Sequence, residues 1–252
     1  MHLRHAQDRR RVAESLPRFD AIVAVSPFLK DQITDVANAQ VDVIGNVIDT
    51  DYFSPGTGVP DAGSRGAFKV LAVALLTREK RIDLIIDAIA MCMRNGVGPI
   101  ELKVIGDGPH RHALERRVVE RGLGAVVRFV GLADRRAVRD AMRKADVLVL
   151  ASDAETFGVV VAEAMACGIP VIATRAGGPE FIIEPGTGIL VPTGDVAALA
   201  AALIRLRDEP AIVSGLAARA SIVRRFGRGA FLRNLGNVYA RVSKQWLPRA
   251  SS

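Results

Sequence analysis

Residues 145–175 read ADVLVLASDAETFGVVVAEAMACGIPVIATR. Two apolar runs of strand length, within 146–152 and 170–175, flank a segment of helical character at 157–167. Apolar runs that do not alternate with polar residues are typical of parallel strands buried on both faces. The stretch therefore predicts a strand, a helix and a second strand of one parallel sheet.

The same alternation continues on both sides of this stretch. Further strands are predicted at 68–76, 100–106, 126–131 and 188–192, and helices at 80–94, 111–121, 134–144 and 195–207. Strands that alternate with helices in this way indicate an α/β fold, a doubly wound parallel sheet with helices on both faces. After Pro210 the pattern is entirely helical, with interruptions at Gly227 and Gly229.

The first 65 residues have a different character. They predict a strand at 18–26, a helix at 27–37, a second strand at 41–46 and a linker rich in Gly, Pro and Ser at 54–66. Two strands and a helix are too few for a sheet core of their own, so they must pack on the main domain, on a partner chain or on a domain that is absent. We therefore divide the chain into residues 1–65, 66–210 and 211–252.

The composition is that of an ordinary globular protein, with 50% apolar and 24% charged residues. No apolar run reaches the 18 to 20 residues of a membrane span, and the first residues, MHLRHAQDRRR, lack the apolar core of a signal peptide. Cys92 and Cys167 both lie in apolar helical patterns and predict buried thiols in a reducing compartment. These features favour a cytoplasmic location.

The formal charge of +7 is unevenly placed. Residues 211–252 contain no acidic residue, and they carry eight basic ones: Arg219, Arg224, Arg225, Arg228, Arg233, Arg241, Lys244 and Arg249. Three readings fit: a solvated helical face packed on the domain, a surface that contacts an anionic membrane, or a nucleic-acid contact. No nucleic-acid motif accompanies the charge, so we expect no nucleic-acid partner. Peripheral contact with the inner membrane face stays open.

The ligand site is expected where the strands end, because open α/β sheets bind ligands at the carboxyl ends of their strands. Phosphate loops of the P-loop and dinucleotide types are absent. Polar or glycine-rich segments do follow four strands, and they include Lys80, Gly106, Gly108, Glu155 and Gly158. Gly158 opens a predicted helix, and the free N–H groups of a helix start attract phosphate.

Glu163 lies inside the otherwise apolar helix that Gly158 opens. A carboxylate is costly to bury without a partner. Either the hydroxyl groups of a ribose or a buried arginine would supply that partner.

The segment 145–182 resembles the signature of family-4 glycosyltransferases, also called glycosyl transferases group 1. The E-x7-E motif matches at Glu155 and Glu163, within the contexts T-F-G, E-A-M-A-x-G-x-P-V and G-G-x-E-x-I. The sequences EKRIDLIIDAI (79–89), VIGDGP (104–109), FVG (129–131) and GNVIDTDYFSP (45–55) match as well. The resemblance implies the GT-B fold, in which two Rossmann-like domains face each other across a cleft.

The resemblance also implies roles for the site residues. Lys80 and Glu155 would be catalytic, Lys80 neutralising the diphosphate of a nucleotide-sugar and Glu155 hydrogen-bonding the sugar hydroxyls. Donor binding would fall to Gly106, Gly108, Val130, Gly131, Thr156, Phe157, Gly158 and Glu163. Among these, the backbone at Thr156, Phe157 and Gly158 would meet the sugar and phosphate, Glu163 would accept from the ribose, and Val130 and Gly131 would border the base. A helix N-terminus and a lysine together stabilise a departing diphosphate, so no metal or other cofactor is expected.

The sequence departs from the family pattern in three places. The arginine that often lies five residues before the lysine is absent, because residues 74–76 read Ala-Leu-Leu; Arg78 or Arg81 could substitute. The linker turn N-G-V-D reads Asn-Val-Ile-Asp at 46–49 and loses its glycine. Residues 1–65 resemble only the last strands and linker of the N-terminal acceptor domain, so we interpret them as a truncated remnant.

The linker contains a short acidic motif. The D-x-D sequence at Asp49 and Asp51 is the metal motif of another glycosyltransferase fold. Its place in the linker favours turn chemistry instead.

The sequence thus predicts a retaining glycosyltransferase that moves a hexosyl unit from a nucleotide-diphosphate sugar to a carbohydrate or lipid-linked acceptor. The alternative is a non-catalytic half that binds the nucleotide-sugar and needs a partner chain. Homo-oligomerisation is also open.

Overall fold

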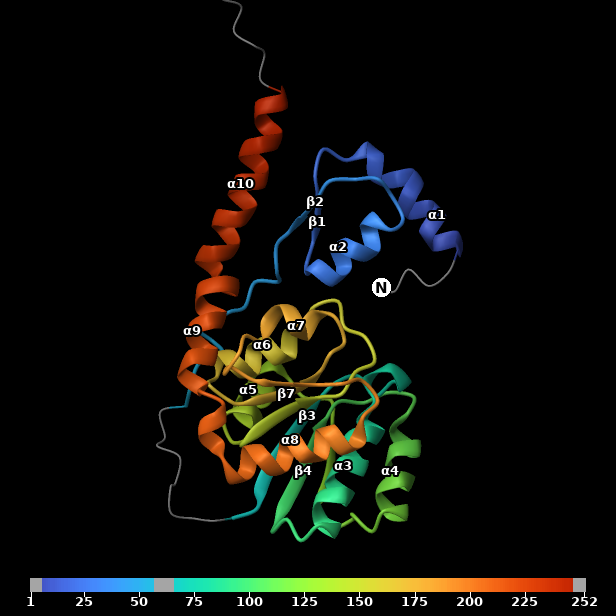
Figure 1. The fold of residues 1–252 in the computed structure, drawn as a ribbon, viewed down its shortest axis with the longest axis vertical. Coiled ribbons are helices and arrows are strands. Elements are labelled where there is room, and N and C mark those ends of the chain that lie inside the picture. Colours follow the sequence, from blue (N-terminus) through green and yellow to red (C-terminus); the bar gives the residue numbers. More distant parts are fainter. Residues whose placement is uncertain (1–5, 57–65, 247–252) are drawn as a thin grey trace, which may run out of the picture.

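The computed structural model describes residues 6–56 and 66–246, and most of the predicted linker at 54–66 lies outside this range. The chain forms a small N-terminal part and a larger α/β part, with the last helix rising from the larger part beside the smaller one (Figure 1).

The larger part is built on a six-stranded sheet with the strand order β5-β4-β3-β6-β7-β8, and every neighbouring pair is parallel. Its strands are β3 (Phe68–Val73), β4 (Ile100–Ile105), β5 (Val127–Gly131), β6 (Val147–Leu150), β7 (Val171–Thr174) and β8 (Ile189–Val191). The central strands β6 and β7 are buried at every position. This confirms the predicted doubly wound α/β fold.

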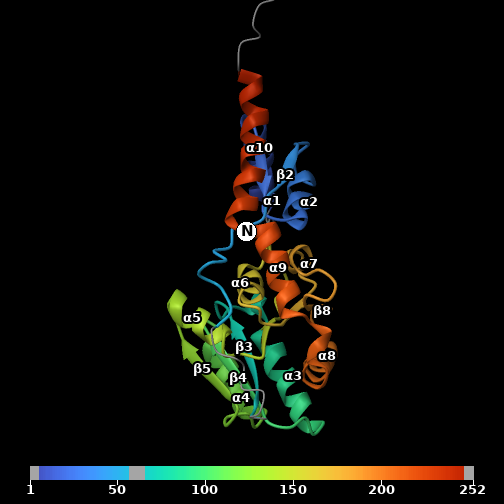
Figure 2. The ribbon, with the colours of Figure 1, turned by 90° about the vertical axis from the view of Figure 1, so that its left-hand side faces the viewer.

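Helices cover both faces of this sheet (Figure 2). One face carries α3 (Ile82–Arg94), α4 (Arg111–Glu120) and α8 (Val196–Asp208), and the other carries α5 (Arg135–Met142), α6 (Val159–Ala166), α7 (Gly178–Ile182) and α9 (Gly215–Phe226). Successive strand residues point to opposite faces, so Val70 of β3 lies in the first core and Leu71 in the second.

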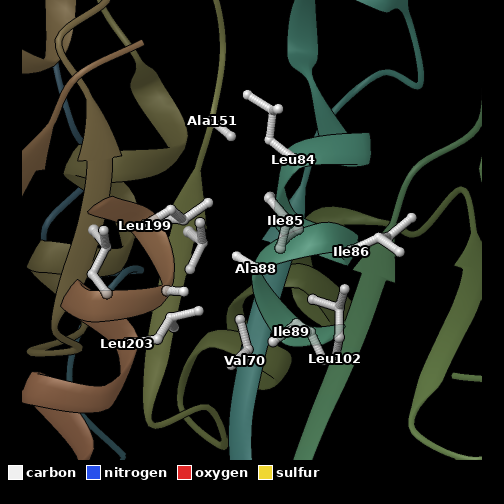
Figure 3. Packing of buried hydrophobic residues seen from close by; sticks show 14 of the residues in the cluster. Val70, Leu84, Ile85, Ile86, Ala88, Ile89, Leu102, Ala151, Leu199 and Leu203 are labelled. Carbon is white, nitrogen blue, oxygen red and sulfur yellow. The ribbon is translucent and has the colours of Figure 1, made fainter. Parts of the chain in front are cut away.

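The first core is densely apolar. Ile85 and Ile89 of α3 lie over β3, with Leu199 and Leu203 of α8 on one side, whereas Ile86 points to the other side (Figure 3). Val70 of β3 and Leu102 of β4 belong to the same core. The spacing of Ile85 and Ile89 places them on one helical face, which explains why the segment folds as an amphipathic helix on the sheet.

The small part consists of α1 (Ala6–Ser15), a 3₁₀ turn (Leu16–Arg18), β1 (Ile22–Ala24), α2 (Pro27–Thr34) and β2 (Val41–Val43). Strands β1 and β2 form a separate two-stranded parallel sheet that does not join the main one. Helix α2 contacts α7 of the larger part, so the small part packs on the main domain as one of the expected arrangements.

The C-terminal helices connect both parts. After a 3₁₀ turn (Pro210–Ile212), Ala218, Ile222 and Phe226 of α9 pack in the second core. Helix α10 (Arg228–Trp246) then runs beside the small part (Figure 1). There Arg241 forms an ion pair with Asp42 of β2. At the junction, the N–H of Ile48 donates to the carbonyl of Phe226 at 2.8 Å.

Two details differ from the sequence prediction. Helix α3 begins at Ile82, because Arg78–Lys80 forms a 3₁₀ turn and Arg81 takes a left-handed conformation with φ of 48°. Of the two predicted interruptions, only Gly227 separates α9 from α10, and Gly229 lies within α10. A Cβ at Gly227 would lie 2.6 Å from the carbonyl oxygen of Val223, whereas one at Gly229 would meet only the end of the Arg233 side chain.

Cys92 and Cys167 are buried free thiols, as predicted. Burial raises the pKa of each to about 11. Among the helices between residues 6 and 246 that the structure describes, none has the length and apolarity to cross a membrane.

Candidate functional site

The loops that follow β3 and β4 join beyond the sheet. The N–H of Leu76 donates to the carbonyl of Asp107 at 2.9 Å, and the N–H of His110 donates to the carbonyl of Leu76 at 2.9 Å. Gly106 allows this approach: its φ is 136°, and a Cβ there would lie 1.8 Å from the carbonyl oxygen of Ala74. The glycine at this predicted donor-binding position is therefore already required by the fold.

Lys80 and Glu155 meet directly, although 75 residues separate them in the sequence. The Lys80 Nζ lies 2.6 Å from Glu155 Oε1, and the two side chains are 28% and 13% exposed. Lys80 ends the 3₁₀ turn after β3, and Glu155 lies in the loop after β6, the strand next to β3. The structure thus brings the two predicted catalytic residues together at the carboxyl edge of the sheet.

A second set of contacts holds these two loops together. Arg81 follows Lys80 and donates to Asp83 and to Asp153 at 3.0–3.2 Å. The N–H of Asp153 also donates to the carbonyl of Glu79 at 2.9 Å. The left-handed backbone of Arg81 is unfavourable for a non-glycine residue, and its two carboxylate partners offset that cost.

The backbone of Glu155 is fixed from the other side by the loop after β7. Its N–H donates to the carbonyl of Ala176, and its carbonyl accepts from the N–H of Gly178, both at 2.8 Å. Ser152, which is completely buried, donates to Glu155 Oε1 at 2.8 Å. The Glu155 carboxylate is therefore held on a rigid support.

The residues Thr156, Phe157 and Gly158 lead from Glu155 into helix α6. Gly158 is the N-cap with φ of 97°, and the N–H groups just beyond it have no acceptor within the helix. The ring of Phe157 is buried and meets the ring of Phe226 edge to face at 5.3 Å. Phe157 therefore belongs to the second core, and its side chain is not free to contact a ligand.

The side chain of Glu163 makes no hydrogen bond or ion pair with the described part of the chain. Burial raises the pKa of its carboxyl to about 7, and the charge of Arg135 opposes this shift. Arg135 itself pairs with Asp49 at 3.3 Å and lies over the ring of Tyr52. The buried arginine partner considered from the sequence is therefore not present among these residues, and a hydroxyl donor would satisfy the carboxylate.

Val130 and Gly131 end strand β5 at the same edge of the sheet. Val130 is exposed, and the carbonyl of Gly131 accepts from the N–H of Gly106 at 2.8 Å. An exposed apolar side chain beside a glycine fits the predicted contact with a base.

The absent family arginine corresponds to Leu75, whose side chain is 58% exposed. Of the two suggested substitutes, Arg81 is bound to Asp83 and Asp153. Arg78 is exposed and forms no ion pair with residues 6–56 or 66–246. Of these two substitutes, Arg78 is therefore the one that remains available.

A hollow of about 370 Å³ lies beside these loops, between the starts of α3 and α4. It is lined by Thr77, Arg78, Arg81, Ile82, Asp83, His110, Ala113, Leu114, Arg117 and Asp153. Neither Lys80 nor Glu155 lines it. Arg81 is neutralised by its acidic partners and Arg117 by Asp87, so the hollow is not strongly cationic.

Asp49 of the D-x-D sequence makes turn contacts. Its Oδ1 accepts from the N–H of Tyr52 at 3.1 Å, and its other oxygen faces Arg135. Across the described residues, no three His, Cys, Asp or Glu side chains gather in a way that could hold a metal ion.

Half of the basic residues of the C-terminal segment are tied to the body of the protein. Arg219 donates to the carbonyls of Thr50, Phe53 and Ala166. Arg224 and Arg225 face Glu184, and Arg241 faces Asp42. Arg249 lies outside the described residues. The solvated, packed face considered from the sequence accounts for these four cations.

Sequence reasoning missed two serines of the site. Ser26, completely buried, caps α2 and donates to the carbonyl of Thr156 at 2.5 Å. Ser152 supports Glu155. A serine before Pro27 is a helix-start signal, but no sequence signal indicates the contact with Thr156.

Comparison with known proteins identifies the family. The chain matches the family described as Glycosyl transferases group 1 over residues 63–221. It is 31% identical over 223 residues to a D-inositol 3-phosphate glycosyltransferase of Thermomonospora curvata, which covers 80% of this chain and 52% of that protein. It is also 31% identical over 211 residues to a glycogen synthase of Mycobacterium tuberculosis, covering 82% and 49% of the two chains.

The fold agrees with solved structures. A sucrose-phosphate synthase from Thermosynechococcus elongatus matches with a TM-score of 0.84 and 29% identity, over 96% of this chain and 63% of that one. The Anabaena protein HepE, solved with UDP and glucose, matches with a TM-score of 0.80 and 23% identity, over 94% and 67% of the two chains.

Together these matches confirm the resemblance seen in the sequence. The chain belongs to the glycosyl transferases group 1, with the α/β architecture of GT-B structures. It spans about half the length of the curated relatives it matches.

Proposed function

We propose that this chain binds the donor in a retaining glycosyl transfer, in which a hexosyl unit moves from a nucleotide-diphosphate sugar to an acceptor. The observation that carries the proposal is the contact between Lys80 and Glu155 at the carboxyl edge of the sheet, next to the start of α6. Relatives named as glycosyltransferases and HepE solved with UDP-glucose support this choice of donor.

Each group would act on one part of the donor. The Lys80 ammonium and the free N–H groups of α6 would stabilise the negative charge that develops on the departing nucleoside diphosphate. Glu155 would accept hydrogen bonds from the sugar hydroxyls. These groups need no metal ion to perform that task.

The remaining donor contacts follow the same edge of the sheet. Glu163 would accept from the ribose hydroxyls, and Val130 and Gly131 would border the base. The backbone of Thr156, Phe157 and Gly158 would meet the sugar and phosphate. Gly106 and Gly108 would let the loop after β4 approach the ligand.

We infer further that the acceptor is a carbohydrate or a lipid-linked carbohydrate and that the protein works in the cytoplasm. The basic helices α9 and α10 would contact the anionic inner face of the membrane. Arg228, Arg233 and Lys244 would serve that contact, since they form no ion pair with the described residues. The protein would associate with a partner chain or with a second copy of itself.

Calorimetry against UDP, GDP and ADP tests the donor site. One of the three should bind, and Lys80→Ala should weaken that binding, with the wild-type affinity falling as salt rises. Arg205→Ala, a change of an exposed cation on α8, serves as the control and should leave affinity unchanged. Absence of binding by all three nucleotides would reject the proposal.

A second candidate is a module that binds the nucleotide-sugar without transferring the sugar. It is favoured by the position of the assigned residues, all of which lie between Lys80 and Glu163. Incubation with radiolabelled UDP-, GDP- and ADP-sugars and crude lipid acceptors distinguishes the two. Transfer of label, also in the presence of EDTA, identifies the enzyme, and binding without transfer identifies the module.

A further inference from the structure

The two oxygens of the Glu155 carboxylate have unequal surroundings. Oε1 accepts from Lys80 Nζ at 2.6 Å and from Ser152 Oγ at 2.8 Å. Within residues 6–56 and 66–246, no group donates to Oε2. No buried side-chain oxygen of this part of the chain lacks a partner, so Oε2 belongs to the exposed portion of the side chain.

Ser152 is well placed to fix this asymmetry. It lies two residues beyond the end of β6, its side chain is completely buried, and its carbonyl accepts from the hydroxyl of Thr174 on β7 at 2.6 Å. A serine hydroxyl has one proton, and here that proton goes to Glu155 Oε1. The serine is thus held in place by β7, and its hydroxyl in turn holds one oxygen of the Glu155 carboxylate.

Lys80 cannot perform this task alone. A bound diphosphate attracts the lysine ammonium, and Glu155 then shares its cationic partner with the ligand. The hydroxyl of Ser152 is neutral and buried, so its hydrogen bond to Oε1 persists when an anion binds nearby.

We propose that Ser152 is a positioning residue, which keeps Oε1 turned toward Lys80 and presents Oε2 to a sugar hydroxyl of the donor. This inference rests on the proposed donor site. It assigns the discrimination between a nucleotide-sugar and the bare nucleotide to a single carboxylate oxygen and to the serine that orients it.

The test compares Ser152→Ala with the wild-type protein by calorimetry, using UDP and UDP-glucose, or the GDP or ADP pair if that nucleotide is the one that binds. Loss of one hydrogen bond to a charged group lowers affinity roughly 10- to 150-fold. We expect that loss for the nucleotide-sugar and a change of less than about twofold for the nucleotide. Lys80→Ala should weaken both ligands.

A matched control is available in Ser221→Ala. Ser221 is also buried and also donates to a glutamate, Glu184, but it lies on α9, away from the donor site. This variant should bind both ligands as the wild type does. Ser152→Cys keeps the shape of the side chain with a somewhat larger sulfur atom and replaces the hydroxyl with a weak donor, so it should show the same selective loss if Ser152→Ala does not fold.

Three outcomes overturn the inference. Equal weakening of both ligands would assign Ser152 a purely structural role, and unchanged affinity for both would show that Glu155 needs no such support. Both results leave the proposed donor site standing. Failure of the wild-type protein to bind any of the nucleotides would instead reject the donor site, and the role of Ser152 with it.

Discussion

The hydroxyl of Ser26 donates to the carbonyl of Thr156, 130 residues further along the chain. The same oxygen accepts from the N–H of Leu29 and so caps helix α2. One buried side chain therefore starts a helix of the small part and fastens that part to the loop that carries Glu155.

Ser26→Ala removes both hydrogen bonds. An N-cap and a buried hydrogen bond each contribute about 1 kcal/mol, so the free energy of unfolding should fall by about 2 kcal/mol. Amide hydrogen exchange at residues 155–158 should also accelerate. Ser214→Ala is the control, since Ser214 caps α9 without a second contact; it should lower stability by about 1 kcal/mol and leave exchange in that loop unchanged.

Glu163→Gln should change how stability depends on pH. Burial raises the pKa of Glu163 to about 7, above its ordinary value of 4.5. Between these values the unfolded chain releases the proton while the folded protein retains it, so wild-type stability falls as the pH rises. The glutamine variant should match the wild type below the unfolded value, at about pH 4, and exceed it by about 1–3 kcal/mol at pH 8, measured by urea unfolding.

The control for this pH effect is Glu184→Gln. Hydrogen bonding from Ser221, with the nearby charges of Arg225 and Arg224, lowers the pKa of Glu184. Replacing the ionised Glu184 carboxylate should therefore lower the free energy of unfolding at pH 8. If both variants changed the free energy of unfolding at pH 8 in the same direction, the assigned burial of Glu163 would be contradicted.

Glu163→Ala should weaken binding of the preferred nucleoside diphosphate by about 1–3 kcal/mol, the range for hydrogen bonds to a charged group. The reason is the loss of an acceptor for the ribose hydroxyls. Calorimetry with the 2′,3′-dideoxy analogue provides the control, because the mutation should not affect a ligand that lacks those hydroxyls. Equal losses for both ligands would exclude the ribose contact.

Leu75→Arg should strengthen binding of the nucleoside diphosphate. It restores a cation at an exposed position beside the loops of Lys80 and Gly106, and a new charge-assisted hydrogen bond contributes about 1–2 kcal/mol. The gain should diminish as salt rises. Leu216→Arg adds the same charge at an exposed position on α9, and an equal gain there would indicate a nonspecific effect.

Arg219→Ala should destabilise the fold by about 2–3 kcal/mol in denaturant unfolding. The arginine donates to three backbone carbonyls, and its removal leaves them without that donor. Arg224→Ala, at an exposed ion pair on the same helix, should change stability by less than about 0.5–1 kcal/mol. A small effect for Arg219 would show that water replaces its contacts.

The main sheet was predictable because short stretches of local sequence are enough to identify its strands. Runs such as 147–150 and 171–174 are apolar at every position, and only a parallel sheet covered on both faces buries them. The meeting of Lys80 and Glu155 follows from the same pattern, since both residues come after neighbouring parallel strands.

The supporting contacts were not predictable in this way. Ser26 and Ser152 resemble any other serine in the sequence, and their role depends on partners brought close by the tertiary fold. The left-handed backbone of Arg81 was missed because nothing in the sequence separates it from a first helical residue. Gly227 and Gly229 are likewise equivalent in sequence, and only the approach of the Val223 carbonyl shows which one is needed.

The chain crosses between its two parts twice, once through residues 44–56 and again at Gly227, and these crossings are hydrogen-bonded to each other through Ile48 and Phe226. The two connections between the parts are therefore joined to each other at one point. Apart from this point, the hydrogen bond between Ser26 and Thr156 holds the small part at the edge where the donor is expected to lie. Any separation of the two parts at that edge would have to break this hydrogen bond.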